Sequence, residues 1–160
     1  MAGRSWLWAA AAAGGVHAAF NLFWALGGDW LLPTVGQWAV RLVAERPVRA
    51  GLALGVVALV KALGAALPLV WAAGRLPLRR AWTWAFGMGA TVLIAYGGLN
   101  VAVSWGVLTG VVPSPGGFDR RAQIGHAALW DPLFLGWGIA LAIGLHRTAR
   151  NRFVSSADGH

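Results

Sequence analysis

Four long apolar stretches are the feature that most constrains how this chain folds, because each is long enough to cross a lipid bilayer. A membrane-spanning helix needs about 20 mostly apolar residues. Only 11% of the 160 residues are charged, against roughly 25% in soluble domains. The sequence therefore predicts an all-α integral membrane protein, a four-helix transmembrane bundle forming one domain over residues 1–146. The predicted spans cover about residues 6–26, 50–73, 82–108 and 127–145.

The segments around these spans have their own signals. The first stretch begins like a secretory signal peptide, with Arg4 before apolar and small residues, but it continues past any cleavage point, and we interpret it as a retained helix. Gly27 and Gly28 are expected to end that helix. Residues 31–43 predict either a short amphipathic helix lying on the membrane or an interfacial loop. Residues 147–160 are predicted to be a polar cytoplasmic tail.

The basic residues predict the orientation of the bundle. An even number of spans places both termini on one side, and that side carries more Lys and Arg, which favours the cytoplasm. It holds Arg4, Arg75, Arg79, Arg80, Arg147, Arg150 and Arg152, and the other side holds Arg41, Arg46, Arg49, Arg120 and Arg121. A composition rich in Ala, Gly and Arg favours a bacterial source, so we expect a multi-pass protein of a bacterial plasma membrane.

The net charge of +8 does not indicate a nucleic-acid partner. Arginines that flank membrane spans meet anionic lipid headgroups, and the sequence has no basic stripe with interleaved aromatic residues on a soluble face. The expected partners are therefore membrane lipids and no nucleic acid.

Polar side chains inside the spans form two stripes. His17, Asn21 and Trp24 are spaced i, i+4, i+7 and share one helix face, as do Tyr96 and Asn100. With the termini in the cytoplasm, these groups lie between mid-membrane and the outer surface. Polar groups in hydrocarbon are costly and face the bundle or a wet cavity. The sequence therefore predicts an outward-facing polar pocket, with ligand-binding candidates His17, Asn21, Trp24, Lys61, Tyr96, Asn100 and Asp131.

Each of these residues also has a purely structural interpretation. His17 bonds either to Asn100 or to a backbone carbonyl. Lys61, at mid-span, is expected to pair with an acid, either Asp131 or Asp29. Asp131 alternatively caps the N-terminus of the last span.

The remaining candidates are as consistent with packing as with ligand binding. Trp24 either lines the pocket or packs in the bundle, and Asn21 either binds a ligand or forms an interhelical hydrogen bond. The chain has no cysteine, its histidines lie on different elements, and it has no phosphate-cradling glycine loop. We therefore predict no metal site and no cofactor.

Three segments of the sequence together resemble a known family. His17, residues 24–28 (WALGG), Trp30 and Pro33 form its opening motif, Lys61 marks a Lys-bearing second helix, and residues 130–133 (WDPL) start the last helix. The chain resembles the bacterial family of small four-span membrane proteins catalogued as domain of unknown function (DUF) 3995. The resemblance implies no established activity.

Three functions stay open at this level. The first is binding of a lipid-soluble small molecule in the polar pocket. The second is a membrane enzyme acting on an isoprenoid or a quinone by acid/base chemistry, with His17, Asp131 and Lys61 as candidate catalytic residues. The third is a structural or accessory subunit of a membrane complex. Glycine-rich helix faces, such as the one with Gly51 and Gly55, also permit a homo-oligomer.

Overall fold

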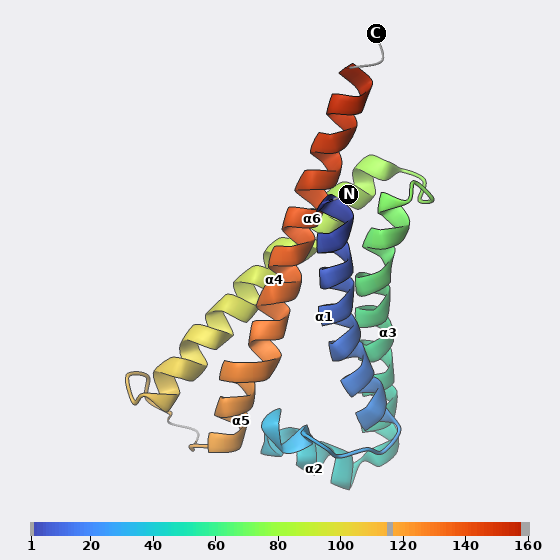
Figure 1. Cartoon of the computed structure of the whole chain (residues 1–160). Coiled ribbons are helices and arrows are strands. Elements are labelled where there is room, and N and C mark those ends of the chain that lie inside the picture. The colour runs from blue at the N-terminus through green and yellow to red at the C-terminus, as the bar shows by residue number, and fades with distance from the viewer. Residues whose placement is uncertain (1, 115–116, 158–160) are drawn as a thin grey trace.

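The computed structural model describes residues 2–114 and 117–157, and this part of the chain is helical with no strands. Four long helices dominate it (Figure 1): α1 (Ala2–Ala25), α3 (Pro47–Ala72), α4 (Arg79–Leu108) and α6 (Asp131–Ala157). The shorter elements are η1 (Leu32–Thr34), α2 (Gln37–Glu45), α5 (Arg120–Gly125) and η2 (His126–Trp130). The elements α5, η2 and α6 follow one another without a break.

The long helices pack side by side in the order α3, α1, α6, α4. Helices α1 and α3 form one antiparallel pair and α4 and α6 form another, and α1 packs on α6 to join the two pairs (Figure 1). Helix α1 begins and α6 ends at the same end of the molecule. Because α3 and α4 touch only slightly, the α1–α6 contact forms the centre of the fold.

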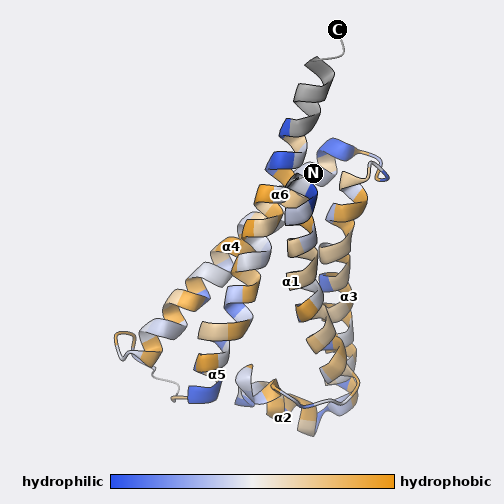
Figure 2. Cartoon of the chain, in the orientation of Figure 1, coloured by the Kyte–Doolittle hydropathy of each residue, from blue (hydrophilic) through white to orange (hydrophobic). Residues whose placement is uncertain are grey.

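Three helical segments of the described chain are long and apolar enough to cross a membrane: α3, α4 and the continuous segment Arg120–Arg150. Figure 2 shows hydrophilic residues mostly at the helix ends and in the connections. Helix α1 has comparable length, with 24 residues, but it is not among the three. It carries His17 and Asn21, which lower its mean hydropathy. The arrangement is consistent with a multi-pass membrane protein.

The glycine pair ends α1 as predicted. Gly27 adopts a left-handed conformation with φ of 94°. Its N–H donates to the carbonyl of Trp24 at 3.1 Å, and the N–H of Gly28 donates to the carbonyl of Phe23 at 2.9 Å. These two bonds form a Schellman motif, which glycine permits without a steric penalty. The helical alternative for residues 31–43 is right from Gln37 onward, where α2 begins.

The continuous helical segment that contains the last predicted span begins earlier than predicted, at Arg120, where α5 starts. Asp119 caps it, with a side-chain oxygen accepting from Ala122 N at 3.1 Å. Asp131 therefore does not cap a helix, and Pro132 lies inside a continuous helical segment. Proline has no N–H for the carbonyl four residues before it, and the wider π turn η2 ends at Trp130, two residues before Pro132. Helix α6 continues to Ala157, so most of the predicted tail is helical.

Helices α4 and α6 meet at two glycines that bring their backbones together. A Cβ added at Gly97 would lie 2.5 Å from Leu135 N and 2.8 Å from Asp131 O. A Cβ at Gly138 would lie 2.9 Å from Ala90 O. Small residues are common where membrane helices pack closely. The Gly97 contact places the Tyr96–Asn100 turn of α4 against the first turn of α6.

We expect Gly97→Ala to lower the melting temperature of the purified protein by several degrees. The added methyl group meets backbone atoms that cannot move independently, and overpacking of this kind costs about 1–3 kcal/mol. Thermal unfolding in detergent measures the effect. Gly98→Ala is the control, because its Cβ would meet only Leu135 Cδ1, at 3.9 Å. Equal melting temperatures for the two variants would contradict the prediction.

Candidate functional site

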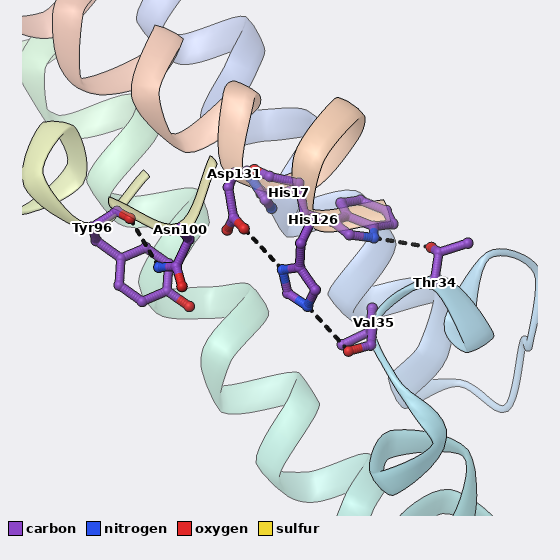
Figure 3. A network of polar contacts seen from close by, with 8 residues as sticks. His17, Thr34, Val35, Tyr96, Asn100, His126 and Asp131 are labelled. Carbon is purple, nitrogen blue, oxygen red and sulfur yellow. Dashed lines mark hydrogen bonds and ion pairs between the residues drawn. The ribbon is translucent and has the colours of Figure 1, made fainter. Parts of the chain in front are cut away.

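Asp131 is the most deeply buried charged side chain of the described residues, with 1% of it exposed. Its Oδ2 lies 2.9 Å from Nδ1 of His126 (Figure 3). Its Oδ1 is buried and has no hydrogen-bond partner. Buried polar atoms nearly always have a partner in folded proteins, so this oxygen retains the capacity to accept a hydrogen bond.

His126 connects the buried carboxylate to the segment after α1. Its Nε2 lies 3.2 Å from the backbone carbonyl of Val35, and a carbonyl only accepts, so Nε2 carries a hydrogen. One further proton then lies between Nδ1 and Asp131. On Nδ1 it makes an ion pair, and on the carboxylate it makes two neutral groups. The pair therefore has no net charge in either form.

The π turn explains why His126 and Asp131 meet. Residues five apart point in different directions on an α-helix, whose neighbours are three and four apart. The i→i+5 bonding of a π turn brings residues five apart onto one face, and such turns are frequent at functional sites. Sequence reasoning missed His126 because it assumed α-helical spacing. Pro132 was the available signal, since it disfavours an unbroken α-helix there.

His17 is 3% exposed and bonds to the other end of the same turn. Its Nε2 donates to the carbonyl of Trp130 at 3.1 Å, so the carbonyl is its partner, as one of the two structural alternatives predicted. Its ring stacks on Phe134 with centroids 3.9 Å apart. Helix α1 is thereby attached to the residue next to Asp131.

Phe134 brings together residues from all four long helices. His17 of α1 stacks on it, Nζ of Lys61 on α3 lies 4.9 Å from its ring centroid, and Tyr96 of α4 meets it edge-on at 5.5 Å. A cation over an aromatic face is attracted to the ring. The structure pairs Asp131 with His126 rather than Lys61, and in the described chain Lys61 makes no ion pair.

Tyr96 and Asn100 border the site from α4. Nδ2 of Asn100 donates to the carbonyl of Tyr96 at 2.8 Å, so this donor bonds within α4 and not to His17. Figure 3 shows both side chains projecting from the same face of the helix. Tyr96 is 51% exposed. These two residues therefore flank the buried carboxylate and are not buried with it.

Asn21 and Trp24, the other members of the α1 stripe, have different environments. Asn21 is buried, and its Oδ1 has no hydrogen-bond partner. Trp24 Nε1 donates to the carbonyl of Trp30 at 2.9 Å, and its ring packs against Phe20 and Trp130. Trp24 therefore packs among aromatic rings, whereas Asn21 adds a second buried acceptor without a donor.

The 3-10 turn η1 is attached to this end of the site by two bonds. Nε1 of Trp130 donates to Oγ1 of Thr34 at 3.0 Å, and His126 bonds to Val35 (Figure 3). Gly125 makes this approach possible, because a Cβ there would run into the backbone oxygen of Thr34. The turn therefore covers the π segment closely.

The open grooves on α1 and α3 are apolar and are not lined by His17, Lys61 or Asp131. The polar residues are instead gathered around Phe134 and the π turn. We call this group the polar cluster, and it consists of His17, Asn21, Lys61, Tyr96, His126 and Asp131. Among the described residues, no three His, Cys, Asp or Glu side chains are grouped as a metal site would require.

Comparison with known proteins identifies a family. Residues 14–141 match the family described as protein of unknown function, DUF3995. No curated protein and no solved structure matches the chain. The matched region runs from α1 to the middle of α6 and contains every residue of the polar cluster.

Proposed function

Since the chain belongs to the DUF3995 family of proteins of unknown function, we propose from its geometry that it binds a lipid-soluble small molecule at His17, Lys61, Asp131 and Phe134. The supporting observation is Oδ1 of Asp131, a buried carboxylate oxygen without a donor. Leaving such an oxygen unpaired costs about 1–3 kcal/mol, and more for a charged group. A hydroxyl or amine of a ligand would supply the missing hydrogen bond.

The proposal includes the placement of all four long helices across a bacterial plasma membrane, with both termini in the cytoplasm. Helix α1 packs between α3 and α6, so its neighbours cover His17 and Asn21, which are 3% and 6% exposed. Polar side chains are tolerated in a membrane when they face the bundle. On this placement, the polar cluster lies toward the outer surface.

The surroundings of Asp131 favour an amphiphile with an apolar body. Phe134 offers an aromatic ring, and Lys61 and Tyr96 contact that ring from α3 and α4. Tyr96 is 51% exposed and contacts Phe134, so a ligand dissolved in the bilayer would approach this ring beside Tyr96. Its donor group would reach Asp131 and its apolar part would remain in contact with lipid.

We expect Asp131→Asn to reduce the amount of co-purifying small molecule about tenfold, because a charge-assisted hydrogen bond becomes a neutral one. The asparagine amide still donates to Nδ1 of His126, so the fold is retained. Native mass spectrometry of gently extracted protein measures the bound mass. Asp119→Asn is the control, since it removes the same charge at the same end of the molecule and retains a capping side chain.

Two results would overturn the proposal. One is a wild-type protein that carries no bound small molecule when extracted gently. The other is equal ligand content in the wild type, Asp131→Asn and Asp119→Asn.

The shared proton of His126 and Asp131 favours a second candidate function, acid/base catalysis on a hydroxylated isoprenoid or a quinol. A general acid or base must lie within hydrogen-bond reach of the proton that it transfers, and Asp131 is the group placed to receive it. In this version, His126 joins Asp131 as the second catalytic candidate. Recovery of a chemically altered ligand after incubation would distinguish the enzyme from the binding protein.

A further inference from the structure

A groove separate from the polar cluster runs along the outer face of α1 and α3. It has a volume of about 530 Å³ and is lined by apolar residues, chiefly Leu22 and Leu26 of α1 with Leu52, Gly55, Val56 and Leu59 of α3. A second hollow shares Leu22, Gly55 and Leu59 and extends to Ala62. The two adjoin along these shared residues, and we call them together the α1–α3 groove.

One end of the α1–α3 groove is strongly basic. Pro47 and Val48 line the groove and also line a hollow formed with Arg46 and Arg49. Both arginines are exposed, and neither takes part in an ion pair among the residues that the structure describes. The surface therefore combines a cationic mouth with an apolar channel.

The dimensions of the groove match one leaflet of a bilayer. From Arg49 to Ala62, helix α3 rises about 20 Å, at 1.5 Å per residue. Half of the hydrocarbon core of a bilayer is about 15 Å thick. An acyl chain that begins below a headgroup at the arginines would therefore reach about as far as Ala62.

We propose that the α1–α3 groove binds one anionic phospholipid, with its phosphate at Arg46 and Arg49 and an acyl chain along Gly55 and Leu59. Clustered arginines at a membrane surface attract anionic lipid headgroups. Gly55 provides a floor without a side chain, since a Cβ there would have no neighbour within 4 Å. The proposal depends on the membrane placement above but not on the ligand of the polar cluster.

Charge favours a lipid over a second copy of the chain. In a symmetric dimer within one membrane, a second copy docked on this face would bring its own Arg46 and Arg49 to the same depth. Like charges at that distance repel, and the whole chain carries a net charge of +8. An anionic headgroup instead neutralises the two arginines.

The test measures retention of phosphatidylglycerol by native mass spectrometry, after delipidated protein is titrated with phosphatidylglycerol or with phosphatidylcholine. We expect the wild type to retain one phosphatidylglycerol per chain and little phosphatidylcholine. Gly55→Leu, which fills the groove, and the double variant Arg46→Gln/Arg49→Gln are each expected to reduce retention about tenfold.

Matched controls lie on the other side of the molecule. Arg120→Gln/Arg121→Gln removes the same charge from α5, and Gly136→Leu adds the same side chain at a glycine of α6 that also has no neighbour within 4 Å. Both controls are expected to retain phosphatidylglycerol as the wild type does.

Several outcomes would overturn the proposal. They are equal retention by test and control variants, equal retention of the two lipids, or a dimer that Gly55→Leu dissociates, which would make a second copy the occupant. Extraction of membranes with alkaline carbonate tests the placement separately. A chain found in the supernatant would overturn both the membrane placement and the lipid site, whereas a chain in the pellet leaves the lipid result to decide.

Discussion

His126→Ala is expected to cause the largest loss of stability of any single substitution in the polar cluster, about 3 kcal/mol. The variant leaves Asp131 buried with neither oxygen bonded, and removing one partner of a buried ion pair costs about 3–5 kcal/mol. The lower end applies because His126 is 30% exposed, so water would enter where the ring was. Thermal unfolding in detergent should show a melting temperature lower by about 6–12 °C.

A second substitution tests whether the unpaired charge causes this loss. Asp131→Asn in the His126→Ala background removes the charge while keeping the shape, so at least half of the lost stability should return. Contacting residues show such non-additivity in double-mutant cycles. His146→Ala, an exposed histidine of α6, is the control and should melt as the wild type does. Additive effects of the two substitutions would contradict the interpretation.

Gly125→Ala is expected to release η1 from the π segment and to destabilise the protein by about 2–3 kcal/mol. The new methyl group would occupy the place of the Thr34 backbone, so η1 must move. Its movement breaks two hydrogen bonds together, from Trp130 to Thr34 and from His126 to Val35.

Hydrogen exchange measured by mass spectrometry follows this displacement directly. Amides of residues 31–36 should exchange at least tenfold faster in Gly125→Ala, which corresponds to about 1.4 kcal/mol of lost local stability. Gly136→Ala adds a methyl group to the same helical segment without any neighbour within 4 Å, and its exchange should be unchanged. Equal exchange in both variants would show that η1 tolerates the added group.

The apolar pattern of the sequence predicted the long helices well, because a run of about 20 apolar residues has few other stable conformations in lipid. Which helices pack against one another was harder to predict. Close contacts at Gly97 and Gly138 determine how α4 lies on α6, but the chain has 23 glycines. Their spacing alone does not indicate which ones touch another backbone.

The candidate site was predicted in part. His17, Lys61 and Tyr96 all contact Phe134, but only His17 is buried, and Tyr96 is 51% exposed. Lys61 was expected to pair with Asp131 or Asp29, but Asp131 pairs with His126 instead. That partner was missed because α-helical spacing separates residues 126 and 131. Asn100 was expected to face other helices, yet its Nδ2 bonds to a carbonyl one turn back on α4.

The proton shared by His126 and Asp131 determines how this pair would respond to a membrane potential. Moving one elementary charge through a full potential of 100 mV involves about 2.3 kcal/mol. The proton that the two side chains share moves within their 2.9 Å separation, a small part of the roughly 30 Å hydrocarbon core. A potential of 100 mV would therefore change the free-energy difference between the two proton positions by at most about 0.2 kcal/mol. Transfer of the proton from one side chain to the other would therefore cost nearly the same free energy in an energised membrane as in a depolarised one.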